Sequence, residues 1–225
     1  MGRAAAVAAA PGRRIAISGR RQDKLEETAQ LIRNAGGEVL VAPLDVTAPG
    51  ETIRVRDAIR SAWGGINDLI LAAGLNTPNR AWSNQKLTEF DDLVSTNLVA
   101  PVRMIDASLA DMRKGGGGQI VLISSYAGWT FSPNAGVAYS ATKTALSSLS
   151  RTLNTQEARH AIRSCHLCPG DVDSDFLQLR PEVPDAQARA VMLRPEDVAR
   201  AVQFVLDSPP HVRIDELVIS PVSQT

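Results

Sequence analysis

Short apolar runs alternate with amphipathic helical patterns along most of the chain, and this alternation constrains the possible folds more than any other feature. The strand-like runs cover residues 14–18, 38–42, 68–73, 120–123, 162–167 and 216–219. The spacing of apolar residues predicts helices over about 25–32, 51–63, 88–112 and 138–160, and a last helix that begins at Pro195. Strands that alternate with helices pair in parallel, and strands that are apolar throughout are covered on both faces. We therefore expect an α/β fold, a three-layer αβα sandwich around a Rossmann-like, doubly wound parallel sheet.

Length and composition indicate a single globular domain spanning residues 1–225. A chain of 225 residues with 44% hydrophobic content can bury one sizeable core. Lysine plus arginine equals aspartate plus glutamate, 24 against 24, which argues against nucleic-acid binding and against a basic membrane-binding patch. The two cysteines form no disulfide framework, and no apolar run reaches the roughly 18 residues of a membrane span. We expect a cytoplasmic protein.

The strongest chemical signal is the segment Tyr139-Ser140-Ala141-Thr142-Lys143, at the start of a predicted helix. Residues four apart lie on one helical face, so the ammonium of Lys143 is expected beside the phenol of Tyr139. A nearby positive charge favours the phenolate and brings a group with a pKa near 10 closer to neutral pH. The spacing alone is not specific, because a surface tyrosine beside a solvated lysine produces it as well.

Other polar residues fall where strands are predicted to end. Ser125 follows the apolar run 120–123, and Pro169-Gly170 follows the run 162–167. In a doubly wound sheet the carboxyl ends of the strands border the ligand crevice. Asn97 lies inside the long predicted helix, where an amide side chain is not a favoured helix former.

These residues, in this order, resemble the short-chain dehydrogenase/reductase family, and the resemblance covers nearly the whole chain. It implies that Tyr139 is the general acid/base and that Lys143 lowers its pKa and binds the nicotinamide ribose. It further implies that Ser125 orients the substrate oxygen and that Asn97 holds a water molecule in the proton relay. The implied activity is that of an NAD(P)-dependent oxidoreductase, which interconverts a secondary alcohol and a ketone by hydride transfer.

The same resemblance assigns cofactor contacts. The candidate cofactor-binding residues are Gly2, Arg20, Arg21, Asp45, Gly74, Tyr139, Lys143, Pro169 and Gly170. Arginine suits the 2′-phosphate of NADP, and no acid stands at 18–21 to accept the 2′-hydroxyl of NAD. NADP is therefore the expected cofactor, with NAD as the alternative. Asp45 matches the family's adenine-contacting acid, although an aspartate that stabilises a turn explains the same position equally well.

The N-terminus departs from the family pattern, which begins with a strand and a Thr-Gly-x-x-x-Gly-x-Gly loop. Met1-Gly2-Arg3 corresponds only to the end of that loop, with Gly2 as its last glycine, and Ala72 stands where the family has asparagine. The absent strand belongs in the middle of the sheet, so two strand edges are expected to be unpaired. The absent loop would cradle the cofactor's pyrophosphate. We favour a start internal to a longer gene product; the alternative is a degenerate, non-catalytic scaffold or binding subunit.

Three further expectations concern metals, substrate and assembly. Cys165 and Cys168 have metal-ligand spacing but fall on opposite faces of a strand, and no second cysteine pair is present, so no metal site is expected. The three histidines, His160, His166 and His211, have no carboxylate or serine partner at a recognisable spacing, which argues against a hydrolytic triad. By resemblance, the loop 173–193 selects a small-molecule substrate, although neither the substrate nor the reaction direction can be identified from it. Its expected apolar wall is Phe176, Leu177, Leu179 and Met192, and its possible polar contacts are Asp173, Asp175 and Arg180. By resemblance, a homodimer or homotetramer forms through the two long helices, whose surplus apolar residues are Leu98, Val102, Ile105, Leu146, Leu149 and Leu153.

Overall fold

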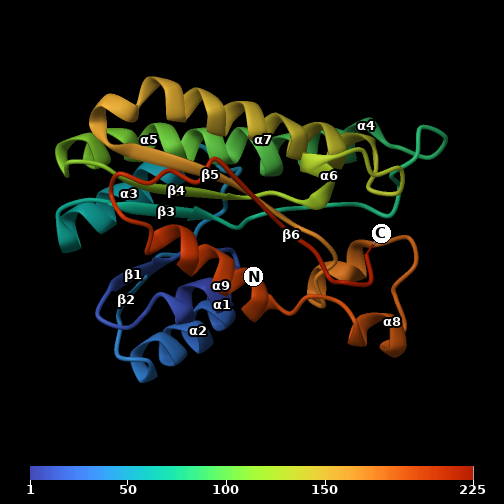
Figure 1. Cartoon of the computed structure of the whole chain (residues 1–225), viewed down its shortest axis with the longest axis horizontal. Coiled ribbons are helices and arrows are strands. Elements are labelled where there is room, and N and C mark those ends of the chain that lie inside the picture. Colours follow the sequence, from blue (N-terminus) through green and yellow to red (C-terminus); the bar gives the residue numbers. More distant parts are fainter. Residues whose placement is uncertain (225) are drawn as a thin grey trace.

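The computed structural model describes residues 1–224 and confirms an α/β fold in which parallel strands lie between two layers of helices (Figure 1). The strands are β1 (Arg14–Ile17), β2 (Glu38–Val41), β3 (Asp68–Leu71), β4 (Gly118–Ile123), β5 (Ile162–Pro169) and β6 (Glu216–Ile219). Every pair of neighbouring strands is parallel. The alternation of apolar runs and helical patterns was therefore a sound basis for the predicted class.

Helices cover both faces of the strands. They are α1 (Gly2–Ala8), α2 (Gln22–Asn34), α3 (Glu51–Trp63), α4 (Leu87–Val94), α5 (Ala100–Lys114), α6 (Tyr126–Trp129), α7 (Val137–Gln156), α8 (Ala186–Ala190) and α9 (Pro195–Leu206). On β4, Ile120 and Leu122 pack in the same cluster as residues of α3, α5 and α7, whereas Val121 and Ile123 pack with residues of α1 and α9. Alternate residues of a strand point to opposite faces, so this one strand anchors both helical layers.

The strands form two sheets rather than one. β1 and β2 make a two-stranded sheet, and the other four follow the order β3-β4-β5-β6. Within residues 1–224, β1 and β3 are not paired with each other, which agrees with the expectation of two open strand edges. The carbonyls of Ile17 and Gly19 accept hydrogen bonds from residues 42 and 44 of the β2 side, so the peptide groups of Ala16 and Ser18 point away from β2.

The long helix predicted over 88–112 is divided by a wide turn. Between α4 and α5 the backbone forms a π-helical segment, η1 (Ser95–Val99), which contains Asn97. Pro101 gives the physical reason: it has no N–H to donate to the carbonyl four residues earlier, which is that of Asn97, and its ring would clash there in a regular α-helix. The other long helix ends at Gln156, before the predicted residue 160, and a 3₁₀ turn follows.

The loop after β5 also has more structure than the sequence indicated. Its residues form a 3₁₀ helix, η3 (Asp175–Leu179), and the short helix α8, while Val172 and Leu193 bridge its two ends. No strand was predicted in this loop, and apart from that isolated bridge the structure places none between residues 173 and 193.

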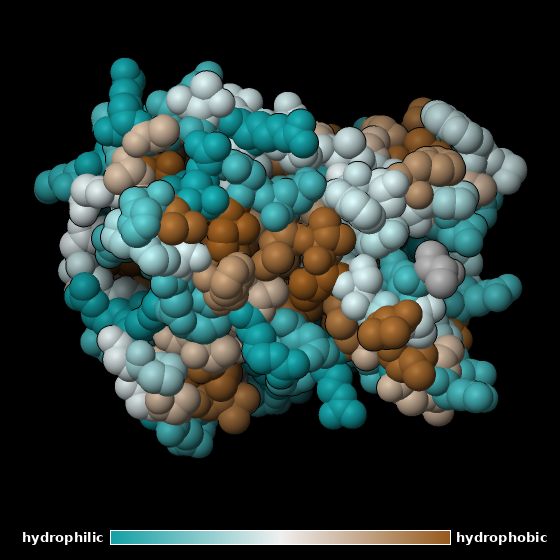
Figure 2. Space-filling model, in the orientation of Figure 1, coloured by the Kyte–Doolittle hydropathy of each residue, from teal (hydrophilic) through white to brown (hydrophobic). Residues whose placement is uncertain are grey.

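The apolar residues predicted for subunit contacts belong mostly to the core. Ile105, Leu146 and Leu153 are buried, Leu98 and Leu149 are half-buried, and Val102 is exposed. Figure 2 shows hydrophobic residues gathered at the centre of the viewed face, where β6 and α9 lie in Figure 1, with hydrophilic residues around them. Since most of the residues predicted for subunit contacts belong to the core, assembly as an oligomer stays a prediction.

Among residues 1–224, no helix combines the length and the apolar character needed to cross a membrane.

Candidate active site

The end of β4 and helix α6 position the first candidate residue, Ser125. Its backbone is extended, and its hydroxyl accepts a hydrogen bond from the N–H of Ala127 at 3.2 Å, so it caps α6. A Cβ at Gly128 would lie 2.5 Å from Ser124 Oγ and 2.7 Å from the carbonyl of Lys143. Only glycine allows α6 to pack this closely on α7, and this packing brings Ser125 next to the residues of α7.

Helix α7 carries Tyr139 and Lys143 one turn apart, both buried. Gly136 precedes the helix with φ +98°, where a Cβ would lie 2.5 Å from Arg80 Cβ, so this start also requires glycine. Lys143 Nζ donates a hydrogen bond to the carbonyl of Ile123 at 3.0 Å and lies 5.7 Å from the centre of the Tyr139 ring. Burial lowers the pKa of Lys143 to about 8.

Lys143 was predicted to lower the pKa of Tyr139, and the structure does not show this effect. Burial raises the pKa of Tyr139, and a hydrogen bond with Ser125 and the positive charges of Arg80 and Arg180 oppose this rise only in part. The ammonium of Lys143 is directed to the Ile123 carbonyl and lies beside the ring rather than at the hydroxyl. In this state of the protein, Tyr139 is a protonated phenol that can donate.

The amide of Asn97 holds the loop after β3. This fully buried side chain accepts a hydrogen bond from the N–H of Leu75 at 2.7 Å and donates to the carbonyl of Leu75 at 2.9 Å. Its amide nitrogen also contacts Thr142 Oγ1 at 3.4 Å. A Cβ at Gly74 would lie 3.7 Å from both Asn97 Oδ1 and Lys143 Nζ. The structure thus brings Gly74, Asn97 and Lys143 together, as the sequence predicted.

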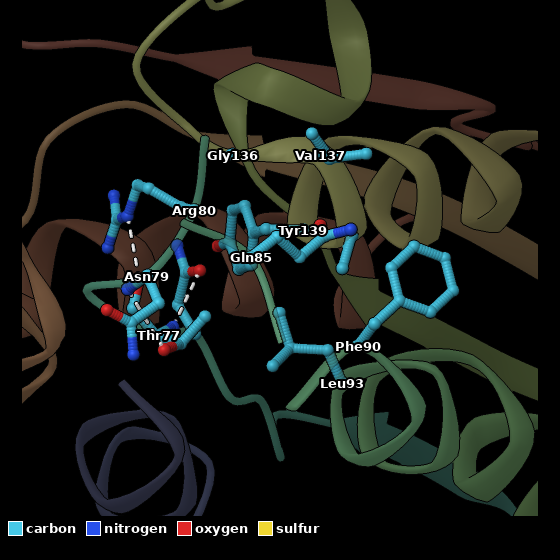
Figure 3. A pocket seen from close by; sticks show the side chains of 11 residues that line it. Thr77, Asn79, Arg80, Gln85, Phe90, Leu93, Gly136, Val137 and Tyr139 are labelled. Atoms are coloured by element: carbon cyan, nitrogen blue, oxygen red, sulfur yellow. Dashed lines mark hydrogen bonds between the residues drawn. The ribbon is translucent and has the colours of Figure 1, made fainter. Parts of the chain in front are cut away.

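Two arginines lie near Tyr139, and the sequence indicated only Arg180, as a possible polar contact of the substrate. Arg80 lines the same pocket as Tyr139, and Figure 3 shows both side chains there. Its guanidinium donates hydrogen bonds to the carbonyls of Thr77 at 2.8 Å, Asn134 at 3.2 Å and Leu179 at 2.7 Å. Arg180 forms an ion pair with Asp171. Arg80 is in a loop without periodicity, so no sequence pattern could have indicated its position.

Phe176, in the loop after β5, packs beside Tyr139. Its ring lies 6.0 Å from the ring of Tyr139, centre to centre, and it packs with a small apolar group that includes Leu93 and Ala138. The sequence predicted Phe176 as part of an apolar substrate-binding wall, and the structure places it against Tyr139. The pocket wall is therefore apolar on one side and carries Arg80 on another.

The residues expected at the adenosine end of a cofactor come from two neighbouring loops. Arg20 and Arg21 follow β1, and Arg21 precedes α2 as its N-cap. Asp45 accepts hydrogen bonds from the N–H of Thr47 at 2.9 Å and from its hydroxyl at 2.7 Å. These bonds lower the pKa of Asp45, and the charge of Arg20 adds to the effect. Asp45 is thus a turn-stabilising residue, as one alternative held, and it also lies near Arg20.

The expected cofactor site is exposed at one point and covered at another. Just after β3, Ala73 and Gly74 are exposed, and Gly74 lies beside Lys143. A Cβ at Gly2 would lie 3.1 Å from Ala72 Cβ, so α1 approaches β3 closely. Beside Gly170, the side chain of Gln224 fills the space and accepts a hydrogen bond from the N–H of Asp171 at 2.8 Å. The residues present fit the ribose and adenine parts, and the turn at Pro169-Gly170 is covered.

With this geometry established, comparison with known proteins decides the family. A family model described as short chain dehydrogenase matches residues 1–184. The chain belongs to this family.

Relatives of this short-chain dehydrogenase extend over almost its whole length. An uncharacterized oxidoreductase of Staphylococcus aureus is 26% identical over 211 residues, which are 94% of this chain and 87% of that protein. An alcohol dehydrogenase from the archaeon Thermococcus sibiricus, solved with 5-hydroxy-NADP, is 28% identical with a TM-score of 0.87, covering 100% of this chain and 93% of that one. A serine dehydrogenase in complex with NADP⁺ is 30% identical with a TM-score of 0.84, covering 95% and 87%. The protein is thus an oxidoreductase with the Rossmann-like fold of its family.

Proposed function

We propose that this short-chain dehydrogenase interconverts a secondary alcohol and a ketone with NADP, and that Tyr139 is its general acid/base. The single observation that carries the proposal is the clustering of Tyr139 with Ser125 and Lys143 at the carboxyl end of β4. Ser125 lies between the end of β4 and helix α6, and Tyr139 and Lys143 lie on α7. The close contact at Gly128 holds α6 against α7.

The chemistry follows from the protonation states. In the direction of reduction, Tyr139 donates its proton to the carbonyl oxygen of the substrate, which its raised pKa permits at neutral pH. Ser125 donates a second hydrogen bond to that oxygen and fixes its position. NADPH, when bound, supplies the hydride to the carbonyl carbon. Asn97 positions Gly74 and Leu75 and, by family resemblance, holds a water molecule that returns a proton toward Tyr139.

The cofactor would be held by residues along the carboxyl edge of both sheets. Lys143 would donate to the nicotinamide ribose, since its ammonium lies beside the exposed Gly74. Arg20 and Arg21 would pair with a 2′-phosphate, with Asp45 and Gly74 at the adenosine. Gly2 would lie near the pyrophosphate, and Pro169 and Gly170 near the nicotinamide once Gln224 moves aside. The solved relatives with bound NADP or 5-hydroxy-NADP support NADP over NAD.

A non-catalytic scaffold or binding subunit is the second candidate, because two observations favour it. The sheet is divided between β1 and β3, and Gln224 covers the Pro169-Gly170 turn. Both observations concern the residues proposed to bind the cofactor, and neither concerns the acid/base residues. By family resemblance, we also propose a small-molecule substrate, a homodimer or homotetramer, and a cytoplasmic location; a monomeric mass by light scattering would contradict the oligomer.

The deciding experiment measures NADPH binding and NADPH oxidation separately. Fluorescence titration gives the affinity for NADPH, and absorbance follows its oxidation with a panel of aliphatic, cyclic and 3-oxo ketones. The proposed enzyme binds NADPH and oxidises it with at least one ketone. A folded protein that binds NADPH and turns over no ketone, or binds no NADPH at all, supports the scaffold instead.

A further inference from the structure

Strands β5 and β6 bring three metal-ligating side chains together beside the candidate active site, where Cys168 directly precedes the Pro169-Gly170 turn. His166 and Cys168 are two residues apart on β5, so both side chains point to the same face of the sheet. Glu216 on β6 is paired in register with His166, and residues paired in register share a face. The sheet pairing therefore brings the imidazole and the thiol of β5 together with a carboxylate that lies 50 residues after His166 in the chain.

The sequence did not indicate the carboxylate partner of His166. No carboxylate stands at a recognisable sequence spacing from this histidine, and the structure places Glu216 Oε1, 50 residues away, 3.0 Å from its Nδ1. The rejection of Cys165 with Cys168 as a ligand pair was correct in its reasoning, because Cys165 packs in the opposite core with residues of α9. The third ligand for His166 and Cys168 comes from the neighbouring strand, which no local spacing could indicate.

The three ligand atoms are close enough for one small cation to bridge them once the Cys168 side chain rotates. Cys168 Sγ lies 3.3 Å from His166 Nδ1 and 3.7 Å from Nε2, beside the ring, and the ligand atoms of all three residues lie within 4.8 Å of one another. Ligands at the usual zinc distances of about 2.0–2.3 Å are about 3.3–3.5 Å apart in a tetrahedron. The Nδ1–Oε1 separation needs to widen by only about 0.3 Å to match this geometry.

Charge and burial also favour a divalent cation. One thiolate and one carboxylate together neutralise a charge of +2, and a neutral imidazole adds no charge. Among residues 1–224, the carboxylate of Glu216 has His166 as its only ion-pair partner, with no lysine or arginine. His166 and Cys168 are buried, while the side chain of Glu216 is 32% exposed and gives an ion access from solvent.

We propose that His166, Cys168 and Glu216 form a binding site for Zn²⁺ or a similar borderline-soft divalent cation. On binding, the Cys168 S–H bond breaks, the proton leaves to solvent, and sulfur forms a bond to the metal without any change of oxidation state. A water molecule completes the tetrahedron at the fourth position. The thiolate and imidazole select against Mg²⁺ and Ca²⁺, which prefer oxygen ligands.

A metal at this position would join the edge strand β6 to β5 directly before the Pro169-Gly170 turn. The edge strand pairs on one side only, so a bond between the two strands adds to its stability. The site needs neither cofactor nor substrate. Its existence and the proposed oxidoreductase activity can therefore fail independently.

The test uses the chain without a histidine tag, reduced and treated with a chelator that is then removed. Co²⁺ is titrated as the probe, because a Co²⁺–thiolate bond produces a strong near-ultraviolet charge-transfer band. The chain has only two cysteines, so the band can come only from Cys165 or Cys168. We expect saturation at one Co²⁺ per chain, displacement of the band by Zn²⁺, and a rise in Tm with Zn²⁺.

The two cysteines provide a matched pair of variants. Cys165→Ser is expected to keep the band and Cys168→Ser to lose it. Because the buried change in Cys168→Ser could disturb folding, Glu216→Gln serves as a second variant at a partly exposed position. It keeps the thiol and the fold, monitored by circular dichroism, and should weaken Co²⁺ binding about tenfold or more. No band in the folded wild type, a band that persists in Cys168→Ser, or unchanged affinity in Glu216→Gln would overturn the proposal.

Discussion

The central strands of the four-stranded sheet, β4 and β5, are buried more completely than the strands of the two-stranded sheet. In β4, five of the six residues are buried, whereas β1 has one buried residue among its four. Ser125, Tyr139, Lys143 and Asn97 are all attached to the four-stranded sheet or its helices, and Arg20 and Asp45 are attached to the two-stranded sheet. The acid/base residues therefore rest on the well-packed part of the molecule, while the cofactor's adenosine end would rest on the less packed part.

Polar contacts at the periphery and apolar contacts on both sides hold the two-stranded part in place. Arg13, just before β1, forms ion pairs with Asp207 at 2.9 Å and Asp68 at 3.9 Å, all partly exposed. Exposed ion pairs of this kind stabilise by about 0–1 kcal/mol each. Ala42, just after β2, is buried in the same cluster as residues of β4 and α3. On the other side, Ala10, just after α1, packs with Ile17 of β1.

The largest expected effect is on catalysis in the well-packed part. Tyr139→Phe removes one hydroxyl and keeps the ring, so turnover of a ketone with NADPH should fall by about 10²–10⁴-fold. Tm should change little, because Phe176 and the core contacts of the ring remain. Steady-state kinetics provide the measurement. The control is Tyr126→Phe, the only other tyrosine, which packs against Trp129 on α6. Turnover in Tyr139→Phe within threefold of the wild type would show that Tyr139 is not the acid/base.

The next effect compares the stability of the two sheets directly. Ile120→Ala empties a fully buried position in β4 and should lower the free energy of unfolding by about 3–5 kcal/mol. Ile17→Ala in β1 removes a side chain that is 7% exposed, in a smaller cluster, and should cost about 2 kcal/mol. Urea denaturation followed by circular dichroism measures both. Equal costs would mean that the two-stranded sheet is as firmly packed as the other.

A smaller effect is expected at the cofactor end. Arg20→Ala with Arg21→Ala removes the groups proposed to bind the 2′-phosphate, and the loss of one charged hydrogen bond costs about 1.5–3 kcal/mol. NADPH affinity should fall about 10–100-fold and NADH affinity should stay the same. Fluorescence titration with each cofactor gives the ratio, and Arg33→Ala at the end of α2 is the matched control. Equal losses for NADPH and NADH would argue against recognition of the 2′-phosphate.

The smallest effect is the pH dependence of stability caused by Lys143. Its pKa is about 8 in the folded protein and 10.5 without the burial, so between these values the unfolded chain binds more protons. The contribution of Lys143 to the free energy of unfolding should therefore rise with pH from about 8 to 10.5, by less than about 1.4 kcal/mol per pH unit. The measurement is the difference between the wild type and Lys143→Met at pH 7.5, 8.5 and 9.5. A difference that falls as pH rises would contradict the lowered pKa.

The sequence predicted the fold class and the six strands, because both depend on local periodicity. Gly74 and Ser125 follow strands β3 and β4, and the ends of parallel strands meet at one edge of a sheet. Asn97 and Lys143 lie on helices, so their position beside Gly74 depends on how these helices pack on the sheet. The position of Arg80 could not be predicted, because its hydrogen bonds link loops far apart in the chain. The raised pKa of Tyr139 could not be predicted either, as it depends on burial by Phe176 and its neighbours. The Glu216 partner of His166 depends on the register of β5 with β6.

The three carbonyl bonds of Arg80 have a consequence for engineering this protein. One guanidinium fastens the segment after β3, the turn before α7 and the end of η3 to one another. The positions of these three segments therefore depend on one another. Grafting the loop 173–193 from a relative with another substrate would replace only one of the three segments. The grafted loop would then have to place a carbonyl where Arg80 now bonds the carbonyl of Leu179. Exchanging specificity requires replacing the three segments together.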